Sequence, residues 1–350
     1  MTITRRPLVV VAAVLAVLVA ACTTGGSADV GDAAVSSTTS TLVQEAVEPL
    51  GLTATAAPTT LGPDVTFYED VRCGDADRNV IDVAVPDVEG SRGDERADTP
   101  LVIQLHGGGF VGGDKSSVWG PGEVAPMVEL LDAGVAVASM NYRLLEDPDP
   151  DGVIKPLMDA ARCLQFIRYH GASTFGIDPD LIALRGGSAG AGTALWLAFH
   201  DDLADPEADD PILRQSTKPI AVAAHGTQAT YDLMRWSTDV FGEYDEMFGE
   251  RNLVELAELF GMSQRLLSFF GITDAGLLES PEIVAYREDV DLLALMDPED
   301  PPSWINNTRE EDTAPVSVGL LFHHSDHARA LERQAALVDY DATVTSGQGA

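Results

Sequence analysis

The sequence predicts an α/β fold built on a mostly parallel β-sheet with helices on both faces. From Asp64 onwards, short apolar runs that favour strands alternate with longer helical patterns, the order typical of a sheet covered on both sides. The segment LIALRGGSAGAGTALWLAF (181–199) combines an apolar strand, a serine between glycines and an apolar helix. Residues 64–350 are long enough to form one large domain with a substantial core.

The pattern of the N-terminal residues 1–21 predicts a signal peptide. Two arginines precede an apolar run that is shorter than the roughly 20 residues a membrane span needs. Two alanines then precede Cys22 in a pattern that resembles a bacterial lipobox, which implies a lipid on Cys22 and an exported, membrane-anchored lipoprotein at the cell surface or in the periplasm. A plain secretory signal, in which Cys22 is incidental, is the alternative, and the arginine pair also resembles a twin-arginine signal.

Residues 22–63 are rich in Thr, Ser, Ala and Gly and poor in aromatic residues. Such a segment buries too little apolar surface to offset the entropy lost on ordering, so it is predicted to be a flexible tether.

Acidic residues dominate the composition, with 56 Asp and Glu against 21 Lys and Arg and a formal net charge of -35. Binding to nucleic acid is excluded as a function class, because phosphate contacts need a basic face. The composition does not determine an oligomeric state.

The predicted strands and helices follow in order along the domain. Strands are expected at VIDVAV (80–85), LVIQL (101–105), VAVASMNY (135–142), LIALRG (181–186), IAVAAHG (220–226), SWINN (303–307) and ATVTS near the C-terminus. Helices are expected in EVAPMVELLDAG, around 156–170, after the serine and in SDHARALERQAALVDY.

Residues from 229 to about 296 interrupt this alternation. They are helical in pattern and contribute Trp236, Phe241, Met247 and Phe248, whose apolar surface is expected to pack over another part of the fold. We interpret the segment as a helical cap over the strand ends. The alternative is an elaborated crossover connection between two strands.

Ser188 lies in Gly186-Gly187-Ser188-Ala189-Gly190, a G-x-S-x-G motif at a strand-to-helix turn. Glycines permit the tight turn that lifts a nucleophilic serine off the sheet, and the positive end of the following helix points at the site. The motif therefore predicts a nucleophile.

A second glycine motif, HGGGF (106–110), directly follows the strand LVIQL. Adjacent glycines let backbone N–H groups face a cavity, where each donor to a developing oxyanion contributes about 3 kcal/mol to lowering the barrier. We assign the oxyanion hole to the N–H groups of Gly108, Gly109 and Ala189. Trp119, a few residues further on, is expected to form an apolar wall of the pocket.

The motifs HGGGF, NYRL, GIDPDLIALRGGSAGAG and DPEDPP together resemble the alpha/beta-hydrolase superfamily, most closely the hormone-sensitive-lipase-like and bacterial feruloyl- or acetyl-xylan-esterase-like carboxylesterases. The resemblance implies an alpha/beta-hydrolase fold with eight strands, an acyl-enzyme mechanism and a Ser–acid–His triad in that chain order. It also implies a small-molecule or polymer-linked ester as substrate.

The position of the family's histidine, after the last strand, is occupied here by TSGQGA, which contains none. His106 belongs to the glycine loop, His170 and His200 are interpreted as surface or structural residues, and His225 ends a strand on the correct edge. This leaves FHHSDH, in which His323 and His324 precede a helix that begins near Ser325 at the carboxyl edge of the sheet.

Either His323 or His324 is therefore the predicted base, whereas His327 is expected to be a solvated residue of the first helical turn. A histidine beyond Ala350 is the remaining possibility.

The acid of the triad is expected after the seventh strand, where Glu310, Glu311 and Asp312 stand in a row. We favour Asp312. Asp232, after the sixth strand, is a rival on the same edge of the sheet.

The chain is thus predicted to be a serine carboxylesterase without cofactor or metal, since the HHSDH cluster lacks the separate supporting ligands of a zinc site. The alternative is a tethered, catalytically inactive hydrolase fold that binds a sugar or lipid. A disulfide between Cys73 and Cys163 is permitted in an exported protein, although Cys163 equally fits a small buried residue in a helix.

Overall fold

The structure is a computed structural model that describes residues 47–87, 98–244, 253–308 and 314–347. The predicted signal peptide, Cys22 and residues 22–46 of the predicted tether lie outside the described residues. Within the described ranges, no helix combines the length and apolar character needed to cross a membrane.

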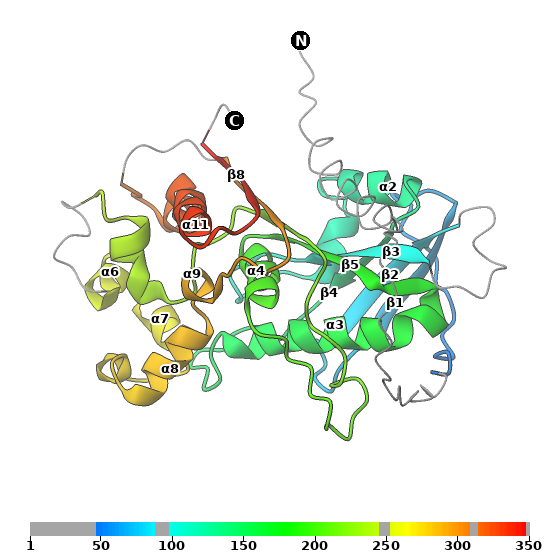
Figure 1. The fold of residues 1–350 in the computed structure, drawn as a ribbon, viewed down its shortest axis with the longest axis horizontal. Helices are drawn as coiled ribbons and strands as arrows, with labels where there is room; N and C mark the ends of the chain where they lie inside the picture. Colours follow the sequence, from blue (N-terminus) through cyan, green and yellow to red (C-terminus); the bar gives the residue numbers. More distant parts are fainter. Residues whose placement is uncertain (1–46, 88–97, 245–252, 309–313, 348–350) are drawn as a thin grey trace, which may run out of the picture.

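The core is an eight-stranded sheet with the strand order β1-β2-β4-β3-β5-β6-β7-β8 (Figure 1). Antiparallel pairing joins β2 to β1 and to β4, whereas the remaining neighbours are parallel, so the predicted mostly parallel sheet of eight strands is confirmed. The strands are β1 (Val65–Arg72), β2 (Val80–Pro86), β3 (Thr99–Leu105), β4 (Ala136–Met140), β5 (Ile177–Gly187), β6 (Val222–His225), β7 (Ser303–Asn307) and β8 (Ala342–Ser346).

Strand β1 was not predicted from the residue runs. It is an edge strand with two carboxylates in its sequence, VTFYEDVR, and only two of its eight residues are buried. Its pairing register shifts between Tyr68 and Val71, which disrupts the alternation of buried and exposed positions that identifies a strand.

Helices α2 (Ala125–Asp132) and α3 (Ile154–Phe175) cover opposite faces of the sheet (Figure 1). Side chains of β3 alternate between the faces: Leu101 and its alternate neighbours join the core beneath α3 and α4 (Ala189–Phe199), whereas Val102 joins the smaller core beneath α2. Because alternate side chains point to opposite faces, one strand contributes to two hydrophobic layers, one on each side of the sheet.

The chain after β6 forms a group of short helices at one end of the sheet (Figure 1). They include the 3₁₀ turns η2 (Leu233–Arg235) and η4 (Ala275–Leu277), the π-helical turn η3 (Trp236–Val240), and the helices α6 (Leu253–Leu259), α7 (Ser263–Phe269), α8 (Pro281–Asp289) and α9 (Leu292–Leu295). Trp236 and Phe241 from this region are buried, whereas Met247 and Phe248 lie outside the described residues.

Between β7 and β8 the chain forms α10 (Val318–His323) and α11 (Ser325–Val338). Only the second of these helices was predicted. The first is six residues long, which is too short to give a clear periodic signal in the sequence.

Cys73, just after β1, and Cys163, in the middle of α3, form a disulfide with their Cα atoms 5.0 Å apart. The sequence left this pairing open. The bridge closes a loop of 90 residues in the chain, and disulfides typically stabilise a fold by about 2–4 kcal/mol, mainly by restricting the unfolded chain.

Candidate active site

Ser188 lies at the turn between β5 and α4 with φ 53° and ψ −121°. A positive φ is uncommon for a residue with a side chain and signals local strain held in place by the surrounding fold. The turn carries Ser188 above the carboxyl ends of the parallel strands, the edge at which α/β folds place their ligands.

Two glycines of the motif make this turn possible through close backbone contacts. A Cβ on Gly186 would lie 2.2 Å from the carbonyl oxygen of Gly190, and a Cβ on Gly190 would lie 2.3 Å from the carbonyl oxygen of Leu105. Because backbone cannot move aside cheaply, larger residues at either position would displace the serine.

His323 contacts Ser188 directly. Its Nε2 lies 2.7 Å from Ser188 Oγ, and its Nδ1 lies 3.0 Å from the carbonyl oxygen of Gly319. A carbonyl oxygen can only accept, so Nδ1 carries the hydrogen and Nε2 is left with a lone pair that accepts the Ser188 hydroxyl proton. This is the tautomer that a general base needs.

The backbone around His323 is fixed by side chains from three other parts of the fold. Gln228 Nε2 donates to the carbonyl of Phe322 (2.8 Å), Asn307 Nδ2 donates to the carbonyl of His324 (3.1 Å), and His327 Nε2 donates to the carbonyl of Leu321 (2.9 Å).

The positions of Gln228 and Asn307 beside His323 were not predicted from the sequence. Their positions just after β6 and at the end of β7 were the available signal, since both lie at the carboxyl edge of the predicted sheet.

The structure distinguishes between the two adjacent histidines. His324 is fully buried, accepts a hydrogen bond from the backbone N–H of Asp326 as the cap of α11, and lies edge-on to Phe241 and Tyr244. It lines neither of the cavities that contain Ser188, whereas His323 lines both. The proposal of His324 as an alternative base is therefore corrected in favour of His323.

The prediction that His327 is solvated is wrong. Its imidazole is fully buried, accepts a hydrogen bond from the backbone N–H of Ala229, and packs against Trp236 and Phe241. Burial lowers the pKa of His327 to about 3, so the ring stays neutral and keeps its Nε2 hydrogen for Leu321.

Two further histidines lie near the site without touching Ser188 Oγ. His106 Nδ1 donates to the carbonyl of Gly107 and its ring stacks on Tyr142, which braces the glycine loop as expected. His225 ends β6, and its carbonyl oxygen accepts the N–H of Ser188, while burial lowers the pKa of its imidazole.

The two remaining histidines are remote from these contacts. His200 ends α4 and pairs with Asp289, and His170 lies within α3.

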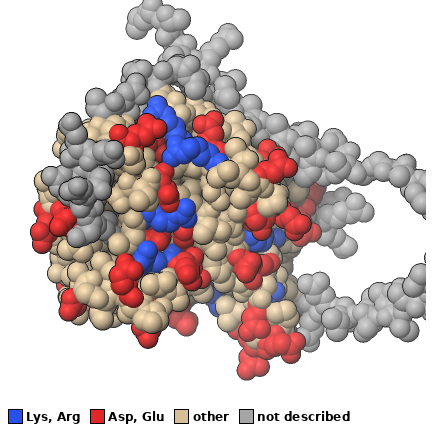
Figure 2. Space-filling model, turned by 60° about the vertical axis from the view of Figure 1, so that its left-hand side comes forward, with Lys and Arg blue, Asp and Glu red and all other residues tan. Residues whose placement is uncertain are grey.

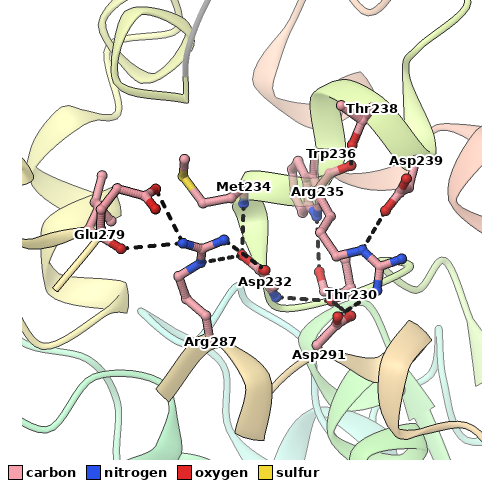
Figure 3. A network of polar contacts seen from close by, with 11 residues as sticks. Thr230, Asp232, Met234, Arg235, Trp236, Thr238, Asp239, Glu279, Arg287 and Asp291 are labelled. Carbon is pink, nitrogen blue, oxygen red and sulfur yellow. Dashed lines mark hydrogen bonds and ion pairs between the residues drawn. The ribbon is translucent and has the colours of Figure 1, made fainter. Parts of the chain in front are cut away.

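Asp232, the alternative candidate for the acid, belongs to a separate network of hydrogen bonds and ion pairs. Its two carboxylate oxygens accept from Arg287, and one of them also accepts the N–H of Met234 (Figure 3). Asp232 therefore forms an ion pair with Arg287 on α8 instead of contacting His323. Glu310, Glu311 and the favoured Asp312 lie outside the described residues.

Gly108 and Gly109 have positive φ values of 109° and 58°, so only glycine fits this loop conformation without strain. Neither N–H donates to an acceptor among the residues that the structure describes. Ala189 is the first residue of α4, whose N–H has no acceptor within the helix. All three residues line the same cavity as Ser188, which makes their N–H groups available to a ligand.

Two cavities meet at Ser188 and His323. The first has a volume of about 420 Å³ and a predominantly apolar lining from α6, α7 and α10, with Arg265 as a charged exception. The second, of about 390 Å³, is more polar and is lined by residues such as Glu123, His225 and Asn307.

Trp119 was expected to form a pocket wall and does not. Its ring packs edge-on against Phe67 in the core beneath α2, and its Nε1 donates to Asp82. The neighbouring Ser117 and Val118 line the second cavity instead.

Parts of the chain are similar in sequence to known proteins. Residues 87–244 match the model of the BD-FAE family. A stretch of 93 residues is 34% identical to "Probable carboxylic ester hydrolase LipM" of Mycobacterium tuberculosis, covering 26% of this chain and 19% of that protein. A stretch of 110 residues is 37% identical to acetylcholinesterase of Gallus gallus, covering 29% of this chain and 13% of that protein. The matches thus span less than a fifth of the length of either relative.

Solved structures of similar fold cover most of the chain. Esterase B from Lactobacillus rhamnosis, in a form inhibited by a C6-C4 compound, aligns with a TM-score of 0.55 and 19% identity over 82% of this chain and 77% of that chain. A truncated carbohydrate esterase from gut microbiota aligns with a TM-score of 0.54 and 14% identity over 85% and 89% of the two chains. At these identities, the likeness establishes the fold.

The buried imidazole of His327 makes folding sensitive to acid. In the unfolded chain a histidine binds a proton below about pH 6.5, whereas folding holds the pKa of His327 near 3. The contribution of His327 to the free energy of unfolding is therefore fully present above about pH 6.5. As the pH falls from 6.5 to 3, this one group lowers the free energy of unfolding by up to about 1.4 kcal/mol per pH unit.

We expect His327→Gln, which retains an amide donor for Leu321, to be less stable than the wild type at pH 8 and to close that gap as the pH falls to 4. Urea unfolding across this range measures the difference. A gap that stays constant with pH would contradict a buried, neutral His327.

Proposed function

We propose that this chain, a member of the alpha/beta-hydrolase superfamily, is a serine carboxylesterase that works through an acyl-enzyme. The observation that carries the proposal is the 2.7 Å contact between Ser188 Oγ and His323 Nε2, with the histidine tautomer set by Gly319. The match to the BD-FAE family model and the esterase fold support the reaction class.

The proposed mechanism uses the two side chains in turn. Ser188 Oγ attacks the ester carbonyl carbon while its proton moves to His323 Nε2, and the carbonyl oxygen becomes an oxyanion held by the N–H groups of Gly108, Gly109 and Ala189. The tetrahedral intermediate then expels the alcohol, which takes its proton from His323. Water attacks the resulting acyl-serine with His323 again as base and releases the carboxylic acid.

The two cavities support an ester as the substrate class. An ester joins two groups at one carbonyl, and here one cavity with a predominantly apolar lining and one with a more polar lining meet at the proposed nucleophile. A substrate with one hydrophobic part and one polar part, either a small molecule or linked to a polymer, would place its scissile bond at Ser188.

Hydrolysis of p-nitrophenyl butyrate tests the proposal. We expect Ser188→Ala and His323→Ala each to lower kcat by a factor of about 10³–10⁶, because a serine without its base is a weak nucleophile and the base without the serine has nothing to activate. His200→Ala, at the far end of α4, is the matched control and should leave kcat near that of the wild type.

Labelling by a fluorophosphonate probe gives a second measurement, which should depend on Ser188. A wild type that neither reacts with the probe nor hydrolyses the ester, yet retains ligand binding, would instead support the inactive binding protein.

We further propose Asp312 as the acid that orients His323, on the basis of its position after β7. Asp312→Asn should lower kcat by about 10²–10⁴ through loss of imidazolium stabilisation. Glu310→Gln and Glu311→Gln remove the same charge from neighbouring positions and serve as controls. Equal and small effects of all three substitutions on kcat would mean that the Gly319 carbonyl alone sets the tautomer.

Export and lipid anchoring through Cys22 are also proposals, supported by the pattern of residues 1–22 and by the Cys73–Cys163 bridge, which suits an oxidising compartment. Expression of the full chain in a bacterium fed labelled palmitate should label the wild type and leave Cys22→Ser unlabelled. Both proteins should still be exported. Label that persists in Cys22→Ser would contradict the anchor at this residue.

A further inference from the structure

Arg265, on α7, brings a positive charge into the otherwise apolar cavity beside Ser188. Its Nη2 donates to the carbonyl oxygen of Gly109 at 2.7 Å, and its guanidinium carbon lies 5.1 Å from the centre of the Phe322 ring. Both contacts lie beside proposed catalytic groups, since Gly109 belongs to the oxyanion loop and Phe322 precedes His323.

No carboxylate pairs with Arg265 among the residues that the structure describes. Two other arginines in the described part of residues 229–296 have acid partners: Arg235 pairs with Asp239 and Asp291, and Arg287 pairs with Asp232 and Glu279 (Figure 3). On the face drawn in Figure 2, Lys and Arg side chains lie among Asp and Glu side chains. Other described arginines that form no ion pair, such as Arg168 and Arg185, line neither cavity at Ser188, whereas Arg265 lines the apolar one.

The guanidinium retains donors for a ligand. It carries five N–H groups in a planar fork and stays protonated in proteins, although burial lowers the pKa of Arg265. One N–H group donates to the carbonyl oxygen of Gly109, and one face of the guanidinium lies over the Phe322 ring. The remaining N–H groups match a carboxylate, which binds a guanidinium through two parallel hydrogen bonds.

Resting on the proposed esterase function, we propose that Arg265 is a specificity residue that selects esters bearing a carboxylate on the part that enters the apolar cavity. The apolar lining removes competing water and strengthens the charge-assisted hydrogen bonds. The substrate class is thus a monoester of a dicarboxylic acid, or an ester whose alcohol part carries an acid group.

The net charge of -35 does not prevent such a ligand from binding. At physiological ionic strength the Debye length is about 8 Å, so distant surface carboxylates are largely screened from the cavity. The nearby guanidinium then dominates the field that a carboxylate experiences at close range.

Matched pairs of esters test the proposal. An isopropyl group has nearly the shape of a carboxylate, so p-nitrophenyl hydrogen adipate is compared with p-nitrophenyl 6-methylheptanoate for the acyl side. For the alcohol side, 4-carboxyphenyl butanoate is compared with 4-isopropylphenyl butanoate. The measured quantity is the ratio of kcat/KM for the anionic ester to kcat/KM for its neutral partner.

We expect Arg265→Gln, which keeps a donor for Gly109, to lower this ratio about 10- to 100-fold in one of the two pairs, because hydrogen bonds to charged groups contribute about 1.5–3 kcal/mol. The lower ratio should come mainly from a higher KM for the anionic ester. For Arg265→Lys, which has a point charge in place of the planar fork, the ratio should lie between those of the wild type and Arg265→Gln. Arg214→Gln removes an exposed arginine outside the cavities and is the control for net charge.

Equal effects of Arg265→Gln on both members of both pairs would overturn the proposal and assign Arg265 to holding the oxyanion loop alone. In that case Ser188-dependent hydrolysis of the neutral esters still stands. A wild type that hydrolyses no ester and is not labelled at Ser188 would overturn the proposed function together with this inference.

Discussion

The geometry of the site depends on three hydrogen bonds that hold the backbone around His323. Helix α10 has only six residues, and so short a helix is not stable by itself. Side chains of Gln228, Asn307 and His327 instead fix the carbonyls of Leu321, Phe322 and His324. Because Gln228 follows β6 and Asn307 ends the neighbouring parallel strand β7, the sheet edge that presents Ser188 also sets the position of His323, its proposed base.

This dependence explains what the sequence could and could not predict. The serine turn and the glycine loop are largely local: Gly108 and Gly186 are required by contacts within a few residues, and Gly190 by a contact with the adjacent strand, so short motifs identify them. The choice between His323 and His324 is not local. His323 is the last residue of α10, whereas His324 is the extended residue between α10 and α11. The tertiary hydrogen bonds from Gln228 and Asn307 on either side of the pair determine which imidazole faces Ser188.

His327 shows how the chain after β6 changes the environment of a residue that its own helix would leave in water. A polar residue in the first turn of an amphipathic helix is ordinarily solvated, and the pattern of SDHARALERQAALV supports that expectation. Trp236 and Phe241 follow β6, far away in the chain, and cover the imidazole completely. The same region removes Asp232 from consideration as the acid, because Arg287 on α8 binds both of its oxygens.

The charges of the site act at different stages of the proposed reaction. Arg265 is already in place beside the cavity, so its attraction for a carboxylate is the same in the bound substrate and in the transition state and contributes uniform binding. The Gly108, Gly109 and Ala189 N–H groups gain strength only as charge develops on the carbonyl oxygen, and therefore act on kcat. The two effects meet at Gly109, whose carbonyl accepts the Arg265 hydrogen bond. A ligand that drew the guanidinium away from this carbonyl would loosen the oxyanion loop, so a productive carboxylate must bind the free edge of the fork while the bond to Gly109 remains.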